Sequence, residues 1–338
     1  MWKLLWACAV WACYAIEAEQ NDGACMLQAR VDAPAEPLAG EEYDSSEVSI
    51  LLTEQRSMLA LPVVVLQAHL HFPELKIQLV YGQSNADFVH NQPSLKQLRS
   101  EGTVILSAMP EPYFSMNMTF RDYQHLLMEP GFWEATKTTK LLVIQADTWM
   151  CQQSHAHLRQ FLNYSYVGAP WPRKNGIPCQ EGNGGFSLRD REAMLEITRK
   201  FGKTNLYEDV YFCTRLYKEG GSLATKSEAG RFARELPLEE SPLHTAEDLP
   251  KELVGIHKLP KWNKEDIQNI FEEGCPGVSL MLEVRTQVDT SPNWEASESL
   301  VQRWETSAKG RTLMLQVSRD FRPFAVRTSD LVRLLKKA

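Results

Sequence analysis

Short apolar runs alternate with amphipathic stretches through the middle of the chain. The runs have the length of strands and predict strands at residues 48–52, 76–81, 103–107, 141–145 and 186–188. The run from Leu141 to Ile144 is apolar at every position, which is typical of a strand buried on both faces of a sheet. This core strand ends at Gln145, directly before Ala146 and Asp147.

Helical stretches separate these strands. The pattern predicts helices at residues 55–70, 94–100, 119–128, 132–136, 154–162, 191–201 and 208–217. Pro62 should break or kink the first of them, and Ser154 and Asp190 are expected as N-caps. Strands that alternate with helices indicate an α/β fold with a mostly parallel, mixed sheet flanked by helices. Ligands of such sheets bind beyond the carboxyl ends of the strands, where Asp147 is expected.

The chain divides into four predicted regions. Residues 1–18 contain Lys3 and a short apolar run, so they predict a signal peptide, with a retained signal anchor as the alternative. Residues 19–46 form a flexible lead-in and residues 47–265 the main domain. Residues 266–338 form a small α+β appendage whose role is open, with a predicted strand from Val278 to Val284. A signal segment implies the secretory pathway (ER or Golgi lumen) or secretion. We expect membrane contact only if the anchor is retained.

The net charge of the chain argues against nucleic acid and anionic membranes as general partners. The 338 residues carry a formal net charge of -7, whereas a general nucleic-acid or anionic-membrane binder needs a basic face. Of the seven cysteines, five lie beyond the signal segment: Cys25, Cys151, Cys179, Cys213 and Cys275. In an oxidising lumen they could form two disulfides and leave one free thiol, or most could be buried thiols. Of two glycosylation sequons, Asn117 is a better acceptor than Asn163.

Asp147 is the first candidate for a functional residue, as a metal ligand. A carboxylate at a strand end can bind a divalent cation, because Mn²⁺ and Mg²⁺ prefer oxygen ligands and take only one or two of them from protein. The alternative is an aspartate that caps a turn. Downstream, Gly182-Asn183-Gly184-Gly185 would let the backbone approach a sugar closely, or would form an ordinary turn.

Two further pairs of adjacent residues are candidates for catalysis or ligand binding. Glu208-Asp209 stands at a predicted helix start, where acids stabilise the helix dipole, but such a carboxylate can also remove a proton from an acceptor hydroxyl. His257 could supply a nitrogen to the cation, and Lys258 could neutralise a diphosphate. The alternative is an ordinary surface His-Lys pair.

The order of these motifs resembles that of an uncharacterised family assigned as glycosyltransferases of the GT-A fold. The motifs are Ile144–Asp147, Tyr166–Trp171, Gly182–Arg189, Glu208–Phe212 and Gly255–Lys258, with Tyr81–Phe88 and Gly131–Trp133 upstream. The resemblance covers roughly residues 46 to 265. It implies a GT-A-like fold, a nucleotide-sugar donor, a glycan, glycoprotein or other hydroxyl acceptor, and Mn²⁺ or Mg²⁺ as cofactor.

The resemblance also implies roles for individual residues. Asp147 would be the last acid of the Asp-x-Asp metal motif, with Gln145 in place of the first acid, and His257 would complete the metal site. Asp209 would be the base, next to Glu208, and inversion is favoured while retention stays open. The remaining roles are nucleotide binding by Thr53, Arg56, Gln145 and Lys258, and sugar or acceptor binding by Trp171, Asn183, Gly184 and Gly185.

Two other hypotheses about the function are compatible with the sequence. The first is a non-catalytic carbohydrate-binding relative of the same fold, which the missing first acid at Gln145 favours. The second is a metal-dependent phosphoesterase, which would cleave simple phosphate esters without an acceptor.

Overall fold

The computed structural model describes residues 43–58, 60–171, 179, 182–235, 249–258, 271, 274, 275 and 278. The predicted signal segment and most of the predicted lead-in and appendage lie outside these residues. Tyr43 is already buried, in ring contact with Phe72, so the ordered domain extends at least to Tyr43. Among the described residues, no helix is long and apolar enough to cross a membrane.

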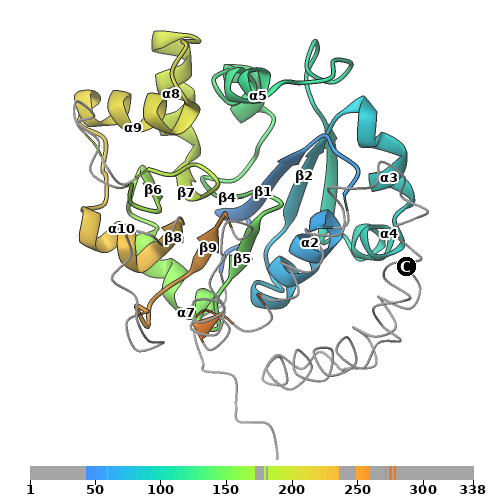
Figure 1. The fold of residues 1–338 in the computed structure, drawn as a ribbon, viewed down its shortest axis with the longest axis horizontal. Coiled ribbons are helices and arrows are strands. Elements are labelled where there is room, and N and C mark those ends of the chain that lie inside the picture. The colour runs from blue at the N-terminus through green and yellow to red at the C-terminus, as the bar shows by residue number, and fades with distance from the viewer. Residues whose placement is uncertain are drawn as a thin grey trace, which may run out of the picture. The chain divides into compact units, whose positions relative to one another are not determined.

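A six-stranded sheet forms the centre of the domain, in the order β3-β2-β1-β4-β7-β6 (Figure 1). The first four strands in that order are parallel, and β7 runs antiparallel to both of its neighbours. The prediction of a mostly parallel, mixed sheet is confirmed. The strand bounds are β1 Val48–Glu54, β2 Ile77–Tyr81, β3 Val104–Ala108, β4 Lys140–Ile144, β6 Tyr166–Gly168 and β7 Phe186–Asp190.

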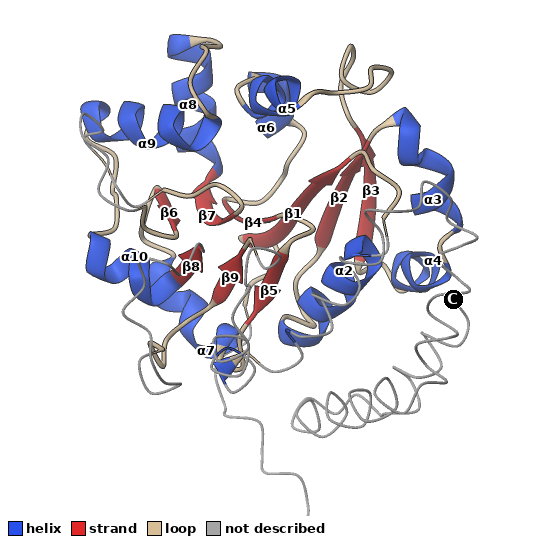
Figure 2. Cartoon of the chain, viewed as in Figure 1, coloured by secondary structure: helices blue, strands red, loops and turns tan. Residues whose placement is uncertain are grey.

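Helices cover both faces of this sheet (Figure 2). One face carries α2 Ala60–His71, α3 Ala86–Asn91, α4 Pro93–Ser100, α7 Ser154–Leu158 and α10 Lys226–Phe232. The other face carries α5 Phe120–Leu127, α6 Pro130–Glu134, α8 Arg191–Phe201 and α9 Glu208–Glu219. Two short 3-10 helices, η1 Gln83–Asn85 and η2 Arg159–Phe161, precede α3 and follow α7.

Alternate side chains of β4 enter the two hydrophobic cores. Leu142 and Ile144 pack beneath α2, whereas Leu141 and Val143 pack beneath α6 and α8. Both sets are almost fully buried, which explains the continuous apolar run because a two-period alternation appears only when one face is solvated. The flanking helices thus hold β4, and the loop that follows it, from both sides.

A second, three-stranded sheet begins just beyond β4. Its order is β5-β9-β8, with β5 Thr148–Met150, β9 Gly255–His257 and β8 Ala233–Glu235. Thr148 pairs with His257 across β5 and β9, and His257 pairs with Glu235 across β9 and β8. This register brings three distant segments of the chain together at the residue that follows Asp147.

Disulfide bonds join Cys151 to Cys275 and Cys179 to Cys213. The structure thus agrees with the two-disulfide alternative, and Cys25 lies outside the described residues. Cys275 is buried in the core beneath α2, as are Phe271 and Val278.

Three local predictions were wrong. Pro62 does not interrupt a helix, because α2 begins at Ala60 and places the proline in its first turn, where no intrahelical N–H bond is lost. Ser154 is not an N-cap. Its hydroxyl donates to the carbonyls of Cys151 and Val254. Val278, where we predicted a strand to begin, is helical, and residues 279–284 lie outside the described part. The N-cap at Asp190 is confirmed by its bond from the N–H of Ala193.

Candidate active site

Two neighbouring cavities open beyond the carboxyl ends of the parallel strands. Their volumes are about 460 Å³ and 330 Å³, and Phe120 and Gln145 line both of them. The larger is lined by Trp171, Asn183, Gly184, Gly185, Glu208, Asp209, His257 and Lys258, among others. The smaller is lined by Thr53, Arg56 and Asp147, among others. All twelve residues that the sequence singled out for the site therefore line one cavity or the other.

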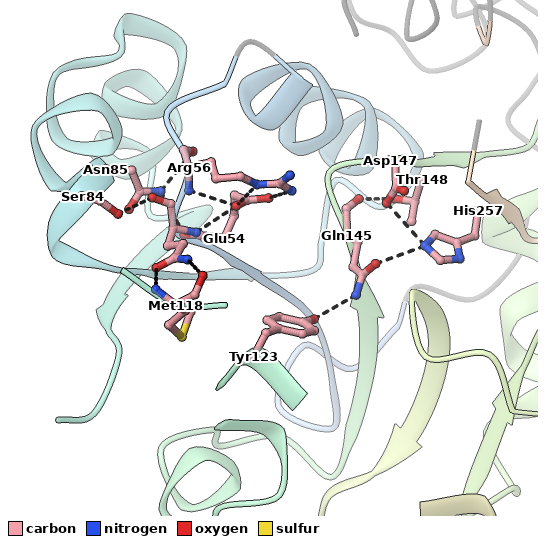
Figure 3. Close-up of polar contacts among 11 residues, drawn as sticks. Glu54, Arg56, Ser84, Asn85, Met118, Tyr123, Gln145, Asp147, Thr148 and His257 are labelled. Carbon is pink, nitrogen blue, oxygen red and sulfur yellow. Dashed lines mark hydrogen bonds and ion pairs between the residues drawn. The ribbon is translucent and has the colours of Figure 1, made fainter. Parts of the chain in front are cut away.

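Gln145 lines both cavities, and its side-chain amide contacts Tyr123 through one atom and His257 through the other (Figure 3). Its Nε2 donates to the Tyr123 hydroxyl at 3.0 Å, and its Oε1 lies 3.1 Å from Nε2 of His257. The same His257 nitrogen is 3.4 Å from Oδ1 of Asp147. Two of the predicted polar side chains, those of Gln145 and Asp147, thus converge on the imidazole nitrogen of a third, His257, on the wall that divides the cavities.

The spacing of these atoms suits one divalent cation. Adjacent ligands of an octahedral ion that lie about 2.1 Å from the metal are about 3.0 Å apart, close to the separation of Asp147 Oδ1 and His257 Nε2. His257 is almost fully buried, and its Nδ1 lacks a hydrogen-bond partner in the described part of the chain, 4.0 Å from Oε1 of Glu235. Within the described residues, no group of three His, Cys, Asp or Glu side chains could hold a metal. Asp147 and His257 therefore fit a site at which a bound phosphate group or water would supply the remaining ligands.

Glu208 is anchored rather than free. Both of its carboxylate oxygens accept from the guanidinium of Arg189, at 2.7 and 3.0 Å, and both side chains are buried. The Arg189 guanidinium lies near the rings of Tyr166, Phe212 and Trp133, at 4.9 to 5.6 Å from their centroids. A bidentate pair of this kind fixes the start of α9 next to β7.

Asp209 lies beside that pair and has a different environment. Its pKa is raised to about 6, first by burial and then by the charge of Glu208. The N–H groups of Val210 and Gly184 and the Arg189 guanidinium act in the opposite direction. The two adjacent acids therefore divide their tasks: Glu208 holds the helix start, and Asp209 presents a carboxylate with a pKa near neutrality to the larger cavity.

The glycine loop has a structural reason that the sequence interpretation missed. A methyl group at Gly185 would overlap the imidazole of His257, and one at Gly184 would overlap the carboxylate of Glu208. These glycines thus leave room for protein side chains, although both also line the larger cavity. Oδ1 of Asn183 accepts from the N–H of Gly185 at 3.0 Å and fixes the turn.

The smaller cavity is built on the end of β1. The Glu54 carboxylate accepts from the N–H groups of Gln55 and Arg56 and from the Arg56 guanidinium, at 2.7 to 3.0 Å. Nδ2 of Asn85 donates to the Glu54 carbonyl at 2.9 Å, and Gln55 exchanges two bonds with the backbone of Met118 (Figure 3). The end of β1, which contains Thr53, and the loop that carries Arg56 are therefore held by the side chain of Asn85 and by the backbone of Met118.

Lys258 and Trp171 stand at the border of the larger cavity. The ammonium of Lys258 pairs with Glu235, and its backbone has a positive φ of 63°. Trp171 packs against the disulfide between Cys179 and Cys213. The disulfide thus joins the segment after β6 to α9, one helical turn beyond Asp209.

Several residues of the site had no role predicted from the sequence. Arg189 could have been suspected, because a cation directly follows the predicted strand of apolar and small residues, Phe186–Leu188. Nothing in the sequence indicated a role for Glu235, because the three-residue strand β8 is too short to show a pattern of apolar and polar residues. Tyr123 and Gln124 looked like ordinary helix residues, but Gln124 accepts from the N–H of Glu208 at 2.6 Å.

Comparisons with known proteins give the following matches. A sequence family described as "Protein of unknown function (DUF5672)" matches residues 106–257, and no curated protein matches the chain. The structure of a mannosyltransferase from Pyrobaculum calidifontis in complex with GDP-Man and Mn²⁺ is 13% identical, with 90% of this chain and 88% of that chain covered and a TM-score of 0.41. The inositol-1-phosphate CTP transferase from T. maritima is 8% identical, with 53% and 84% covered and a TM-score of 0.35. The segment matched by the family contains Asp147, Asp209 and His257.

Proposed function

We propose that this protein is a metal-dependent glycosyltransferase with a GT-A-like fold, which moves a sugar from a nucleotide-sugar donor to a hydroxyl acceptor. One observation carries the proposal. The strand-end carboxylate of Asp147 meets the imidazole of His257 on the wall of two joined cavities, one of which also contains a carboxylate of raised pKa, Asp209.

The smaller cavity is assigned to the nucleotide of the donor. It is bounded by Thr53 and Arg56 at the end of β1 and by Asp147 beyond the end of β4, which is where α/β sheets bind their ligands. Asp147 and His257 would hold Mn²⁺ or Mg²⁺, with Gln145 beside them. A cation bound there would offset the negative charge of the leaving diphosphate.

Asp209 is assigned as the general base. A carboxylate whose pKa is about 6 is ionised at neutral pH and still accepts a proton more readily than an ordinary aspartate. It faces the larger cavity, where an acceptor hydroxyl would give up its proton as it attacks the anomeric carbon. A base on the acceptor side favours inversion at that carbon.

Glu208 and Arg189 are assigned as positioning residues. Nη2 of Arg189 donates to the Gly184 carbonyl at 3.1 Å, and the N–H of Gly184 in turn lowers the pKa of Asp209. The pair therefore fixes both the helix that carries the base and the loop that contacts it.

A donor screen tests the proposal. The full chain is incubated with UDP- and GDP-sugars, with Mn²⁺, Mg²⁺ or EDTA, and nucleotide release is measured with and without neutral saccharide acceptors. We expect release from at least one donor only with the cation, and faster release with an acceptor. No release from any donor would contradict the proposal.

The second candidate is a carbohydrate-binding relative without turnover. Gln145 in place of an acid, and the lack of a third acidic or histidine ligand within the described residues, favour this candidate. It predicts saccharide binding with no nucleotide release from any donor. A phosphoesterase, by contrast, would hydrolyse simple phosphate esters in the absence of an acceptor.

We also propose that the protein acts in an oxidising compartment, the secretory pathway or outside the cell. The disulfide between Cys151 and Cys275 and that between Cys179 and Cys213 support this location, because such bonds persist only where thiols are not kept reduced. Exposed asparagines at both sequons, Asn117 and Asn163, are compatible with it. Mass spectrometry of the protein from its native cells, before and after treatment with a glycosidase, tests the location.

A further inference from the structure

Two large aromatic side chains are exposed at the mouth of the larger cavity. Phe120 is 67% exposed and Tyr207 is 60% exposed, although both line the cavity. Their ring centroids are 5.9 Å apart and their planes are inclined by 55°. Isolated exposed apolar residues need no explanation, but two adjacent rings beside a cavity form a surface for a ligand.

The two rings come from different elements that are fastened together. Phe120 opens α5, and Tyr207 is the N-cap of α9. Nη1 of Arg121 donates to the carbonyl and side-chain oxygens of Asn205, at 3.2 and 3.0 Å. His125, on the next turn of α5, bonds the carbonyl of Thr204 at 3.1 Å.

The start of each element is fixed as well. The Thr119 hydroxyl and the Asp122 carboxylate form a capping box at the start of α5. The N–H of Glu208, directly after Tyr207, donates to Gln124 of α5. The aromatic pair is therefore held in place by contacts of neighbouring residues and would not have to be ordered when a ligand binds.

The charges around the cavity indicate a neutral ligand. Lys258 is paired with Glu235, and Glu208 is paired with Arg189. Among the described lining residues, Asp209 is then the remaining acid, and it would repel an anionic acceptor. The polar lining on one side and the aromatic pair on the other suit a molecule with a hydroxylated edge and an apolar C–H face.

A pyranose ring is such a molecule. Its axial C–H groups present an apolar face that packs flat on an aromatic ring, and its hydroxyls project from the rim. The volume of about 460 Å³ lies within the range of small-molecule sites, about 300 to 1,000 Å³. Phe120 lines both cavities and Tyr207 only the larger one, so a ring stacked on Tyr207 lies on the side of Asp209, away from the smaller cavity.

We infer that Phe120 and Tyr207 form a stacking platform for a neutral pyranoside, which serves as the acceptor. This inference rests on the proposed function and narrows its acceptor from any hydroxyl compound to a saccharide. The platform binds the ring by its C–H face and directs one of its hydroxyls to Asp209.

The test uses the full chain and a panel of neutral methyl pyranosides and disaccharides built from glucose, galactose, mannose and N-acetylglucosamine. Binding is measured by saturation-transfer NMR and by titration calorimetry. Where a donor is turned over, the KM of acceptor and donor are measured separately. The variants are Phe120→Ala, Tyr207→Ala and Tyr207→Phe, with Tyr217→Ala as a matched control because Tyr217 is 58% exposed at the far end of the same helix.

We expect each alanine variant at the platform to weaken pyranoside binding, or to raise the acceptor KM, by about 2- to 13-fold, the range that one aromatic contact provides. Tyr207→Phe should bind as the wild type does, since stacking needs the ring and not the hydroxyl. Tyr217→Ala should have no effect. The donor KM of Tyr207→Ala should stay within about twofold of the wild type, because a residue that merely held the fold would change both constants.

Several results would overturn the inference. The first is that both alanine variants bind pyranosides as tightly as the wild type does. The second is that the wild type binds no neutral pyranoside. The third is that the two rings instead bind peptides or mediate self-association. Failure of the proposed function gives a different result: pyranosides bind through the platform, but no nucleotide is released from any donor. In that case the platform stands and the protein is a saccharide binder.

Discussion

Replacing Asp209 with asparagine should stabilise the fold at neutral pH while it removes the proposed general base. The pKa of this carboxyl is raised from its ordinary 3.8 to about 6, so the folded protein holds a proton that the unfolded chain has lost over this interval. The ionised carboxylate therefore costs stability, and the stability of the wild type falls as the pH rises from about 4 to 6. The full cost is about 3 kcal/mol above the folded pKa, at about 1.4 kcal/mol per pH unit.

The pH dependence separates this effect from packing. At pH 4.5 the cost to the wild type is only about 1 kcal/mol, so the stability of Asp209→Asn relative to the wild type should increase by about 2 kcal/mol between pH 4.5 and pH 8. Urea unfolding of both proteins with disulfides intact measures the free energy at each pH. An equal difference at both pH values would refute the raised pKa. Turnover of the wild type should rise with pH through about 6, and the variant should lose turnover at every pH.

The remaining predictions concern the residues around that base. Glu208→Gln leaves the buried charge of Arg189 without its partner and should destabilise the fold by about 3–5 kcal/mol in urea unfolding, and a loss below 1 kcal/mol would contradict the anchoring role. Gly185→Ala places a methyl against the imidazole of His257, a ligand of the proposed metal site, so the Mn²⁺ concentration for half-maximal activity should rise at least tenfold while far-UV circular dichroism stays native; an unchanged value would refute the close approach. Breaking the Cys179–Cys213 disulfide with paired serines should lower stability by about 2–4 kcal/mol, with turnover measured alongside; equal stability would show that the bond does not constrain the fold.

The large elements of the fold were predictable because their signals are local. The apolar run of β4 and the amphipathic helices around it follow from a period that a short window of sequence displays. The helix start at Glu208 and the cap at Asp190 follow from the preference of acids for the first turn. The position of Asp147 beyond the carboxyl end of a strand was predictable from the direction of the predicted strands.

The links between these elements were not predictable in the same way. His257 meets Asp147 through β5 and β9, two strands of three residues that are too short to show a pattern. The reason for Gly185 lies in that same distant imidazole, and no feature near the glycine in the sequence points to it. Pro62 is harmless because the helix starts five residues later than the apolar pattern indicated.

Nucleotide release from UDP- and GDP-sugars by the wild type and by Asp147→Ala, each with and without Mn²⁺, tests the central claim most directly. If Asp147 holds the metal, Mn²⁺ stimulates the wild type at least tenfold and leaves Asp147→Ala unstimulated, although the variant keeps the thermal stability of the wild type to within a few degrees. Equal stimulation of both proteins by Mn²⁺ would show that Asp147 has no part in holding the metal.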